Sequence, residues 1–336
     1  MNINWDNLTF SLTHTKSMYI AHWDNGVNWT EGELIPFGNI SMSPAAGVLN
    51  YGQGVFEGMK AFRTINEEVV LFRPEKNIER ATLSAERLCI PIIPSGLFMD
   101  GLIKVVGDNR DYIPPTDKGS LYIRPIIWGT GEVLGVAPAP SYTFLIYVSP
   151  VGPYFKSGVR CLNLRVTKKY HRAAPRGVGN FKTIGNYAAS LYPQKLAKSA
   201  GFDEVIYLNA ESDEFIEEVG SANIFIVKDN KIATPPLAGS ILPGVTRDSV
   251  IHIAKEKLEM NVEERPIPLG EMMEADEVFC TGTAVSVTPI GQITSDDSVG
   301  IINNNTIGEI TQTLNTELNN VQKGISEDSF GWLVPV

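Results

Sequence analysis

Short runs of β-branched and aromatic residues recur along this chain, and they constrain its fold more than any other feature of the sequence. Residues 121–127 and residues 143–148 form two such runs, and each is typical of a buried strand. A third run at residues 69–72 precedes Pro74 and an amphipathic segment at residues 76–88, which predicts a strand followed by a helix. Strands interspersed with amphipathic helices indicate a mixed α/β (α+β) fold.

The length of 336 residues and the hydrophobic content of 43% are sufficient for two domains with sizeable cores. A Pro- and Gly-rich stretch at residues 150–158 marks the expected boundary. We therefore expect a smaller N-terminal α/β domain over residues 1–152, a linker over residues 153–168 and a larger C-terminal domain over residues 169–336.

The net charge of −10 argues against nucleic acid or an anionic membrane as a partner, because no basic run or cationic helix face accompanies it. No stretch approaches the roughly 18 apolar residues of a membrane span. The amino terminus also lacks a basic region followed by an apolar run. We therefore expect a cytoplasmic protein that acts on small molecules.

The few cysteines and histidines do not indicate a metal site. Cys89, Cys161 and Cys280 are widely separated and odd in number, which predicts neither a disulfide framework nor a thiolate cluster. His14 and His22 have no carboxylate or cysteine at ligand spacing.

The stretch GVGNFKTIGNYAAS, residues 177–190, places Lys182 where an extended segment gives way to a helix. A sheltered but approachable lysine is suited to forming a Schiff base with a carbonyl, such as the aldehyde of pyridoxal phosphate. The other interpretation of this short motif is an ordinary lysine at a helix start.

Pyridoxal phosphate also requires an acid at its pyridine nitrogen and a phenol near its ring oxygen. Glu218, at the junction into an apolar strand, is the candidate acid, and Tyr187, five residues after Lys182, is the candidate phenol.

The third requirement is a site for the phosphate group. Arg80 near a helix start could bind it, although most helix arginines face water. A helix following Pro243 would have unpaired N–H groups near Val245 and Thr246, which favour an anion. The hydroxyl and N–H groups of residues 281–283 form a second such place.

Two features could belong to a substrate pocket. Residues 47–63, GVLNYGQGVFEGMKAFR, predict either a tight aromatic loop that walls a pocket or a hydrophobic helix packed in a core. Arg124 interrupts an apolar strand, where it would bind either a carboxylate ligand or an internal Asp or Glu.

Eight motifs, in order, resemble the branched-chain amino acid aminotransferases of class IV: FEGMKAFR, LFRPEKNIER, LYIRP, RAAP, NFKTIGNY, EEVGSANIF, LPGVTR and TGTAVSVTP. The resemblance covers nearly the whole chain. It implies a two-domain fold type IV enzyme, with pyridoxal 5'-phosphate between the domains and the C-terminal domain binding it. The implied reaction is the reversible, ping-pong transfer of the amino group of L-leucine, L-isoleucine or L-valine to 2-oxoglutarate through a Lys182 Schiff base (EC 2.6.1.42).

The resemblance also implies roles for individual residues. Lys182 matches the lysine that holds the cofactor and moves the proton, and Glu218 matches the acid paired with the pyridine nitrogen. The remaining cofactor-binding positions that match are Arg80, Arg172, Tyr187, Ser221, Val245, Thr246 and Thr283.

For the substrate, the implied pocket accepts a branched side chain against an apolar wall and the distal carboxylate of glutamate at Arg124. The α-carboxylate is received by the turn at Thr283 and Ala284. The other matching positions are Tyr51, Phe56, Tyr122 and Tyr154, with Lys60 at the rim.

The chain departs from the animal enzymes of this family, which have a Cys-x-x-Cys pair where Val285 and Thr288 stand. Thiol-based redox control is therefore not expected there. The resemblance further implies a homodimer whose partner contributes to each pocket. D-amino acid aminotransferases and aminodeoxychorismate lyases, which share the lysine, the glutamate and the phosphate site, are the alternative assignment.

Overall fold

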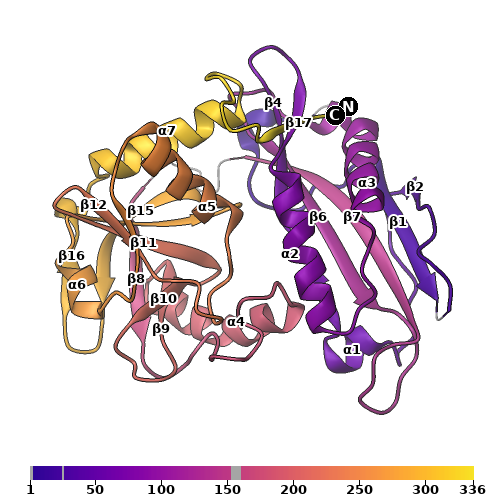
Figure 1. Ribbon diagram of the computed structural model, residues 1–336, viewed down its shortest axis with the longest axis horizontal. Helices are drawn as coiled ribbons and strands as arrows, with labels where there is room; N and C mark the ends of the chain where they lie inside the picture. Colours follow the sequence, from indigo (N-terminus) through magenta and orange to yellow (C-terminus); the bar gives the residue numbers. More distant parts are fainter. Residues whose placement is uncertain (1–2, 25, 153–159) are drawn as a thin grey trace. The chain divides into compact units, whose positions relative to one another are not determined.

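The computed structural model describes residues 3–24, 26–152 and 160–336, and the chain forms two compact units (Figure 1). Unit 1 comprises Met1–Lys156, Phe181–Gly185 and Val321–Val336. Unit 2 comprises Ser157–Asn180 and Asn186–Asn320. The domain limits given above, with a linker at residues 153–168, remain a prediction.

Unit 1 contains an antiparallel sheet in the order β17-β5-β4-β6-β7-β1-β2, with β3 paired to β6. Its longest pairing joins β6 and β7 in continuous register from Ser120 opposite Val151 to Gly129 opposite Tyr142. The strands are β1 (Ser17–Asp24), β2 (Glu33–Pro36), β3 (Gly54–Phe56), β4 (Met59–Arg63), β5 (Val69–Phe72), β6 (Ser120–Gly129), β7 (Ser141–Val151) and β17 (Leu333–Pro335).

The core of unit 1 lies between this sheet and two helices, α2 (Pro74–Arg87) and α3 (Ser95–Asp108) (Figure 1). Proline suits the first turn of α2 because its missing N–H has no intrahelical partner there. Three glycines interrupt the apolar pattern of α3. A Cβ on Gly101 would lie 2.7 Å from the Tyr19 ring, so this glycine allows α3 to pack closely on β1.

Residues 47–63 form neither a single loop nor a single helix. A short helix, α1 (Gly47–Tyr51), ends at Gly52, whose φ of 64° is the left-handed conformation that glycine adopts readily. Strands β3 and β4 follow. The local pattern was ambiguous because the segment changes conformation twice within seventeen residues.

Unit 2 contains a mixed sheet in the order β10-β9-β8-β15-β14-β11-β12-β13, with β16 paired to β15. The β8–β9, β8–β15 and β12–β13 pairs are parallel. The strands are β8 (Leu162–Thr167), β9 (Glu204–Leu208), β10 (Ile216–Val219), β11 (Ala222–Lys228), β12 (Lys231–Thr234), β13 (Val262–Glu264), β14 (Glu277–Gly282), β15 (Ser286–Thr294) and β16 (Val299–Ile301).

Strand β11 is buried on both faces, and Phe225 stacks on Phe279 of β14 with ring centroids 4.9 Å apart. The helices assigned to this part of the chain are α4 (Ile184–Ser199), α5 (Val245–His252), α6 (Leu269–Met273) and α7 (Glu309–Gln322) (Figure 1). Helix α4 contains Pro193 in its interior. Within the described ranges, no helix is long and apolar enough to cross a membrane.

Candidate functional site

The backbone of Lys182 is fixed on both sides. Its N–H donates to Ser84 Oγ of α2 at 2.9 Å, and its carbonyl accepts from the Phe56 N–H at 3.1 Å. Thr183 then forms a β-bridge with Val55 of β3. The side chain of Lys182 is half-buried, with Nζ 4.9 Å from the centroid of the Phe56 ring. Lys182 therefore lies where an extended segment meets α4, and a helix and a strand hold its main chain in place.

Arg80 of α2 is buried, and it forms a two-bond ion pair with Glu57. Its Nε donates to Glu57 Oε1 at 2.8 Å and its Nη2 to Oε2 at 2.7 Å. The Arg80 side chain is 7% exposed and that of Glu57 is 1% exposed. Arg80 therefore does not face water, which was one of the two interpretations of the sequence.

Glu57 has no role in the sequence interpretation, although it lies within the FEGMKAFR motif. It also accepts a bond from Asn77 Nδ2 at 2.7 Å and one from the Gly58 N–H at 3.2 Å. Burial alone would raise the pKa of Glu57, but the charge and hydrogen bonds of Arg80, the charge of Lys182 and the Asn77 bond lower it below the usual value. A lone glutamate beside glycine in an apolar segment was the only local signal of this group.

Three predicted substrate residues form a cluster in unit 1. The Arg124 guanidinium lies 4.9 Å from the Phe56 ring centroid and 5.2 Å from the Tyr122 ring centroid. Its Nη2 also donates to the Tyr122 hydroxyl at 3.1 Å. Lys60 of β4 lies opposite Tyr122 in the sheet, and burial lowers the pKa of Lys60 to about 8. The cluster thus offers cationic and hydroxyl donors beside aromatic surface.

Two other predicted substrate residues are not placed in this cluster. Tyr51 ends α1, is 42% exposed and donates through its hydroxyl to the Leu134 carbonyl. Tyr154 lies outside the described residues.

In unit 2, Glu218 of β10 is paired with Arg172, whose Nη2 contacts Glu218 Oε2. The Glu218 side chain is 2% exposed and that of Arg172 is 6% exposed. Arg172 Nη2 also donates to the carbonyls of Gly179 at 3.0 Å and Ser240 at 2.7 Å. The guanidinium is therefore held by the main chain as well as by the carboxylate.

Asn223, a second residue missed by the sequence interpretation, connects Glu218 to the start of α5. Its Nδ2 donates to Glu218 Oε1 at 3.3 Å and to the Leu242 carbonyl at 2.9 Å. A Cβ on Gly244, the residue before α5, would collide with Asn223 Oδ1. Val245 and Thr246 then begin α5, and both are buried. Asn223 thus bonds both the predicted acid, Glu218, and the backbone just before the predicted anion-binding start of α5.

The remaining predicted residues of unit 2 lie at turns or on α4. Ser221 is exposed between β10 and β11, and Tyr187 is half-buried on α4. Thr283 and Ala284 are half-buried in the turn between β14 and β15. In the part of the chain that the structure describes, no group of three or more His, Cys, Asp or Glu could hold a metal ion.

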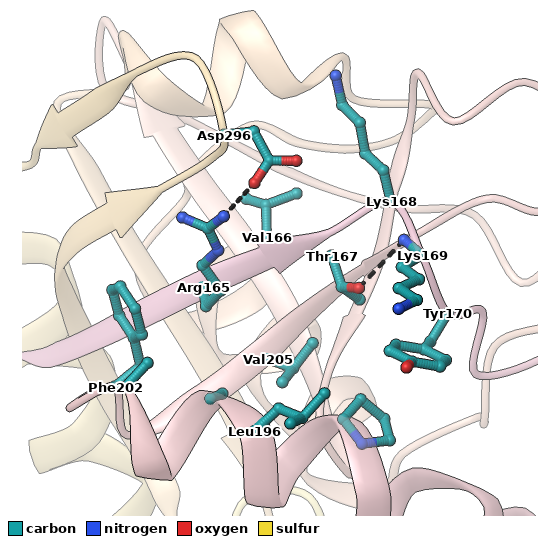
Figure 2. A pocket seen from close by; sticks show the side chains of 13 residues that line it. Arg165, Val166, Thr167, Lys168, Lys169, Tyr170, Leu196, Phe202, Val205 and Asp296 are labelled. Atoms are coloured by element: carbon teal, nitrogen blue, oxygen red, sulfur yellow. Dashed lines mark hydrogen bonds and ion pairs between the residues drawn. The ribbon is translucent and has the colours of Figure 1, made fainter.

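A cavity of about 430 Å³ lies in unit 2, beside β8 and α4. Figure 2 shows the side chains that line it. Leu196, Phe202 and Val205 are among its apolar lining residues, and Arg165 pairs with Asp296 at its edge. None of its lining residues is a predicted site residue. The cavity is therefore separate from the groups described above.

Comparison with known proteins gives concordant matches. The family described as amino-transferase class IV matches residues 54–293. Branched-chain-amino-acid aminotransferase 5, chloroplastic, of Arabidopsis thaliana is 50% identical over 99% of this chain and 80% of its own length. Branched-chain amino acid aminotransferase 1, mitochondrial, of Humulus lupulus is 47% identical over 100% of this chain and 85% of its own length.

Solved structures agree with these relatives. The branched-chain amino acid aminotransferase of Escherichia coli has a TM-score of 0.82 and 28% identity, covering 95% of this chain and 98% of the other. The PLP-form (holo-form) of the Thermobaculum terrenum enzyme has a TM-score of 0.80 and 25% identity, covering 96% and 98%.

The prediction of a cytoplasmic location is contradicted by these comparisons, because the relatives carry chloroplastic or mitochondrial names. The composition could not distinguish these compartments. An acidic chain with three scattered cysteines argues only against a disulfide-based fold and a polyanionic partner.

Proposed function

The chain belongs to the class IV aminotransferases, and we propose which of its residues carry out the reaction of a branched-chain aminotransferase. The enzyme transfers the amino group of L-leucine, L-isoleucine or L-valine to 2-oxoglutarate, and it forms a branched 2-oxo acid and L-glutamate. Its cofactor is pyridoxal 5'-phosphate. The assignment of Lys182 as the lysine that binds the cofactor rests on the hydrogen bonds of its main chain to α2 on one side and to β3 on the other.

The residues present fit pyridoxal phosphate. A buried carboxylate, Glu218, suits a protonated pyridine nitrogen, and Asn223 and Arg172 hold it in position. Arg80 and the first N–H groups of α5 suit the phosphate group. When bound, the cofactor supplies a conjugated ring that withdraws electrons from the α-carbon of the substrate.

Lys182 Nζ is the group that we assign to proton transfer. It would move the proton from the substrate α-carbon to the aldehyde carbon of the cofactor in the first half of the reaction, and in the reverse direction in the second half. The bonds to its main chain fix the position of its Cα and so limit the region that Nζ can reach.

We assign recognition of the two substrates to the cluster of Arg124, Tyr122 and Phe56. The Phe56 ring offers apolar surface to a branched side chain. The Arg124 guanidinium and the Tyr122 hydroxyl, 3.1 Å apart, offer donors to the distal carboxylate of glutamate. Tyr51, Tyr154, Thr283 and Ala284 complete the proposed substrate-binding set. Ser221, Tyr187 and Thr283 complete the proposed cofactor-binding set.

The direct test is to mix the purified protein with L-leucine and 2-oxoglutarate and to measure L-glutamate. We expect glutamate to form with the wild type, and we expect Lys182→Ala to abolish its formation. Turnover of D-alanine without turnover of L-leucine would instead indicate a D-amino acid aminotransferase.

We also propose a homodimer. Leu134 is 95% exposed and Val136 is 87% exposed, and the Leu134 carbonyl bonds the hydroxyl of Tyr51. Apolar side chains this exposed favour burial against a second chain. Light scattering coupled to size exclusion tests the proposal, and a monomer at micromolar concentration would contradict it.

A further inference from the structure

Glu57 lies between β3 and β4, and its carboxylate receives four hydrogen bonds from three other residues. Arg80 supplies two of them, and Asn77 and the Gly58 N–H supply the others. A carboxylate with donors on both oxygens cannot rotate without breaking a bond. Glu57 is therefore a fixed group inside unit 1.

The geometry of the Arg80 pair sets the orientation of the guanidinium. The two bonds to Glu57 use Nε and Nη2, which form one edge of the planar group. Nη1 is not part of this edge. Because the guanidinium is rigid and planar, fixing one edge also fixes the direction of the Nη1 N–H bonds.

A gain in stability alone is a weak explanation for burying the Arg80–Glu57 pair. Burying two charges costs several kcal/mol in desolvation, and apolar replacements of similar volume are often as stable. The positive charge of Lys182, as well as that of Arg80, also acts on the Glu57 carboxylate. Glu57 is therefore coupled to the two cations that the proposed function assigns to the cofactor.

We propose that Glu57 is a positioning residue that orients the Arg80 guanidinium toward the phosphate group of the cofactor. This inference rests on the proposed function, in which Arg80 binds that phosphate. Glu57 does not touch the cofactor in this role. It acts by holding one edge of Arg80 so that the guanidinium does not have to be ordered when the phosphate arrives.

The test compares two ligands that differ only in the phosphate group. Full-length protein freed of cofactor is titrated with pyridoxal 5'-phosphate and with pyridoxal, and each dissociation constant is obtained from the quenching of tryptophan fluorescence. The variants are Glu57→Gln, which keeps the size of the side chain but removes its charge, and Arg80→Gln. Glu79→Gln is the matched control, because Glu79 precedes Arg80 on α2 and forms an exposed ion pair with Lys76.

We expect Glu57→Gln to weaken binding of pyridoxal 5'-phosphate by about tenfold or more, the effect of losing a charge-assisted bond. Binding of pyridoxal should change by less than about twofold, because this ligand has no phosphate for Arg80 to hold. Arg80→Gln should show the same selectivity with a larger loss, and Glu79→Gln should match the wild type.

The outcomes separate this inference from the assignment of Arg80. Equal weakening of both ligands by Glu57→Gln would indicate a purely structural role and overturn the inference. Unchanged binding in Glu57→Gln beside selective loss in Arg80→Gln would overturn the inference alone. If neither variant changed phosphate binding, the assignment of Arg80 and the inference would both be wrong.

A second variant covers the case in which Glu57→Gln does not fold, as judged by circular dichroism. Glu57→Asp keeps the charge but shortens the side chain by one methylene, so it cannot reach both Nε and Nη2. We expect a selective, smaller loss for pyridoxal 5'-phosphate. A folded Glu57→Asp variant that binds both ligands like the wild type would also overturn the inference.

Discussion

Among the residues that the structure describes, each unit buries an arginine–glutamate pair, and the proposed function uses the two pairs in opposite ways. In unit 1 the arginine, Arg80, is the proposed cofactor ligand, and Glu57 is anchored by Asn77 and Gly58. In unit 2 the carboxylate, Glu218, is the proposed ligand, and Arg172 is anchored by two backbone carbonyls.

In each pair the member proposed as the support is held by further protein groups, and in unit 2 the proposed ligand Glu218 also accepts a bond from Asn223. A buried charge can be offered to a ligand only if its partner is held in place by other groups, because the pair alone would rearrange when the ligand arrives. Four substitutions test this difference.

The largest effect is expected for Glu218→Gln. The variant keeps the shape of the side chain but removes the charge that would stabilise a protonated pyridine nitrogen. Glutamate formation from L-leucine should fall by about 10²-fold or more. Glu217→Gln on the same strand is the control and should retain activity. A Glu218→Gln variant with more than half of the wild-type rate would show that Glu218 is a structural partner of Arg172 only.

Arg172→Met should mainly affect stability. The change leaves Glu218 buried without the guanidinium, which lowers the free energy of unfolding by about 3–5 kcal/mol. Urea denaturation measures the loss. Arg63→Met, which breaks an exposed pair with Glu67, should cost less than about 1 kcal/mol. Equal losses in the two variants would contradict the supporting role of Arg172.

Gly244→Ala tests the asparagine that joins Glu218 to α5. The new Cβ would displace the Asn223 carboxamide, so we expect a loss of about 1–3 kcal/mol in stability and weaker binding of pyridoxal 5'-phosphate. Gly270→Ala is the control, because no atom lies within 4 Å of its added Cβ. If Gly244→Ala bound the cofactor like the wild type, the position of Asn223 would not matter for holding Glu218 relative to the start of α5.

The smallest effect concerns Glu217, which shares β10 with Glu218 but accepts a bond from the Ser240 hydroxyl instead of an ion pair. Burial raises the pKa of Glu217 in the folded state. As pH rises from below the unfolded pKa through the raised folded pKa, the unfolded state loses its proton first and the native state loses stability.

Glu217→Gln should therefore be slightly more stable than the wild type at neutral pH. The difference should disappear at low pH, where Glu217 is protonated in both states. Thermal unfolding followed from pH 4 to pH 8 measures it. A stability difference that does not change with pH would show that Glu217 has the same pKa in the folded and unfolded states.

Local patterns predicted much of the secondary structure. The apolar run SLYIRPIIWG coincides with β6, and residues 69–72 coincide with β5. Asp229 and Asn230, turn-forming residues between two apolar runs, both have positive φ, as a tight two-residue turn requires. These elements could be predicted because their signals are adjacent in the chain.

The supporting groups could not be predicted because they act over long sequence separations. Glu57 reaches Arg80 across 23 residues, and the Lys182 N–H reaches Ser84 across 98. Neither Glu57 nor Asn223 is part of a helical or strand periodicity that would have pointed to its contacts. Motif resemblance identified the candidate ligands, whereas the residues that hold those ligands became visible only from the contacts.

The pairing of β17 with β5 has a consequence for biosynthesis. Most of unit 1 precedes unit 2 in the chain, yet its edge strand comes from residues 333–335, after all of unit 2 has been translated. Until then, β5 presents unpaired backbone groups on the nascent chain, a surface that invites misassembly. Unit 2 can therefore complete its sheet on the ribosome before unit 1 acquires this edge strand.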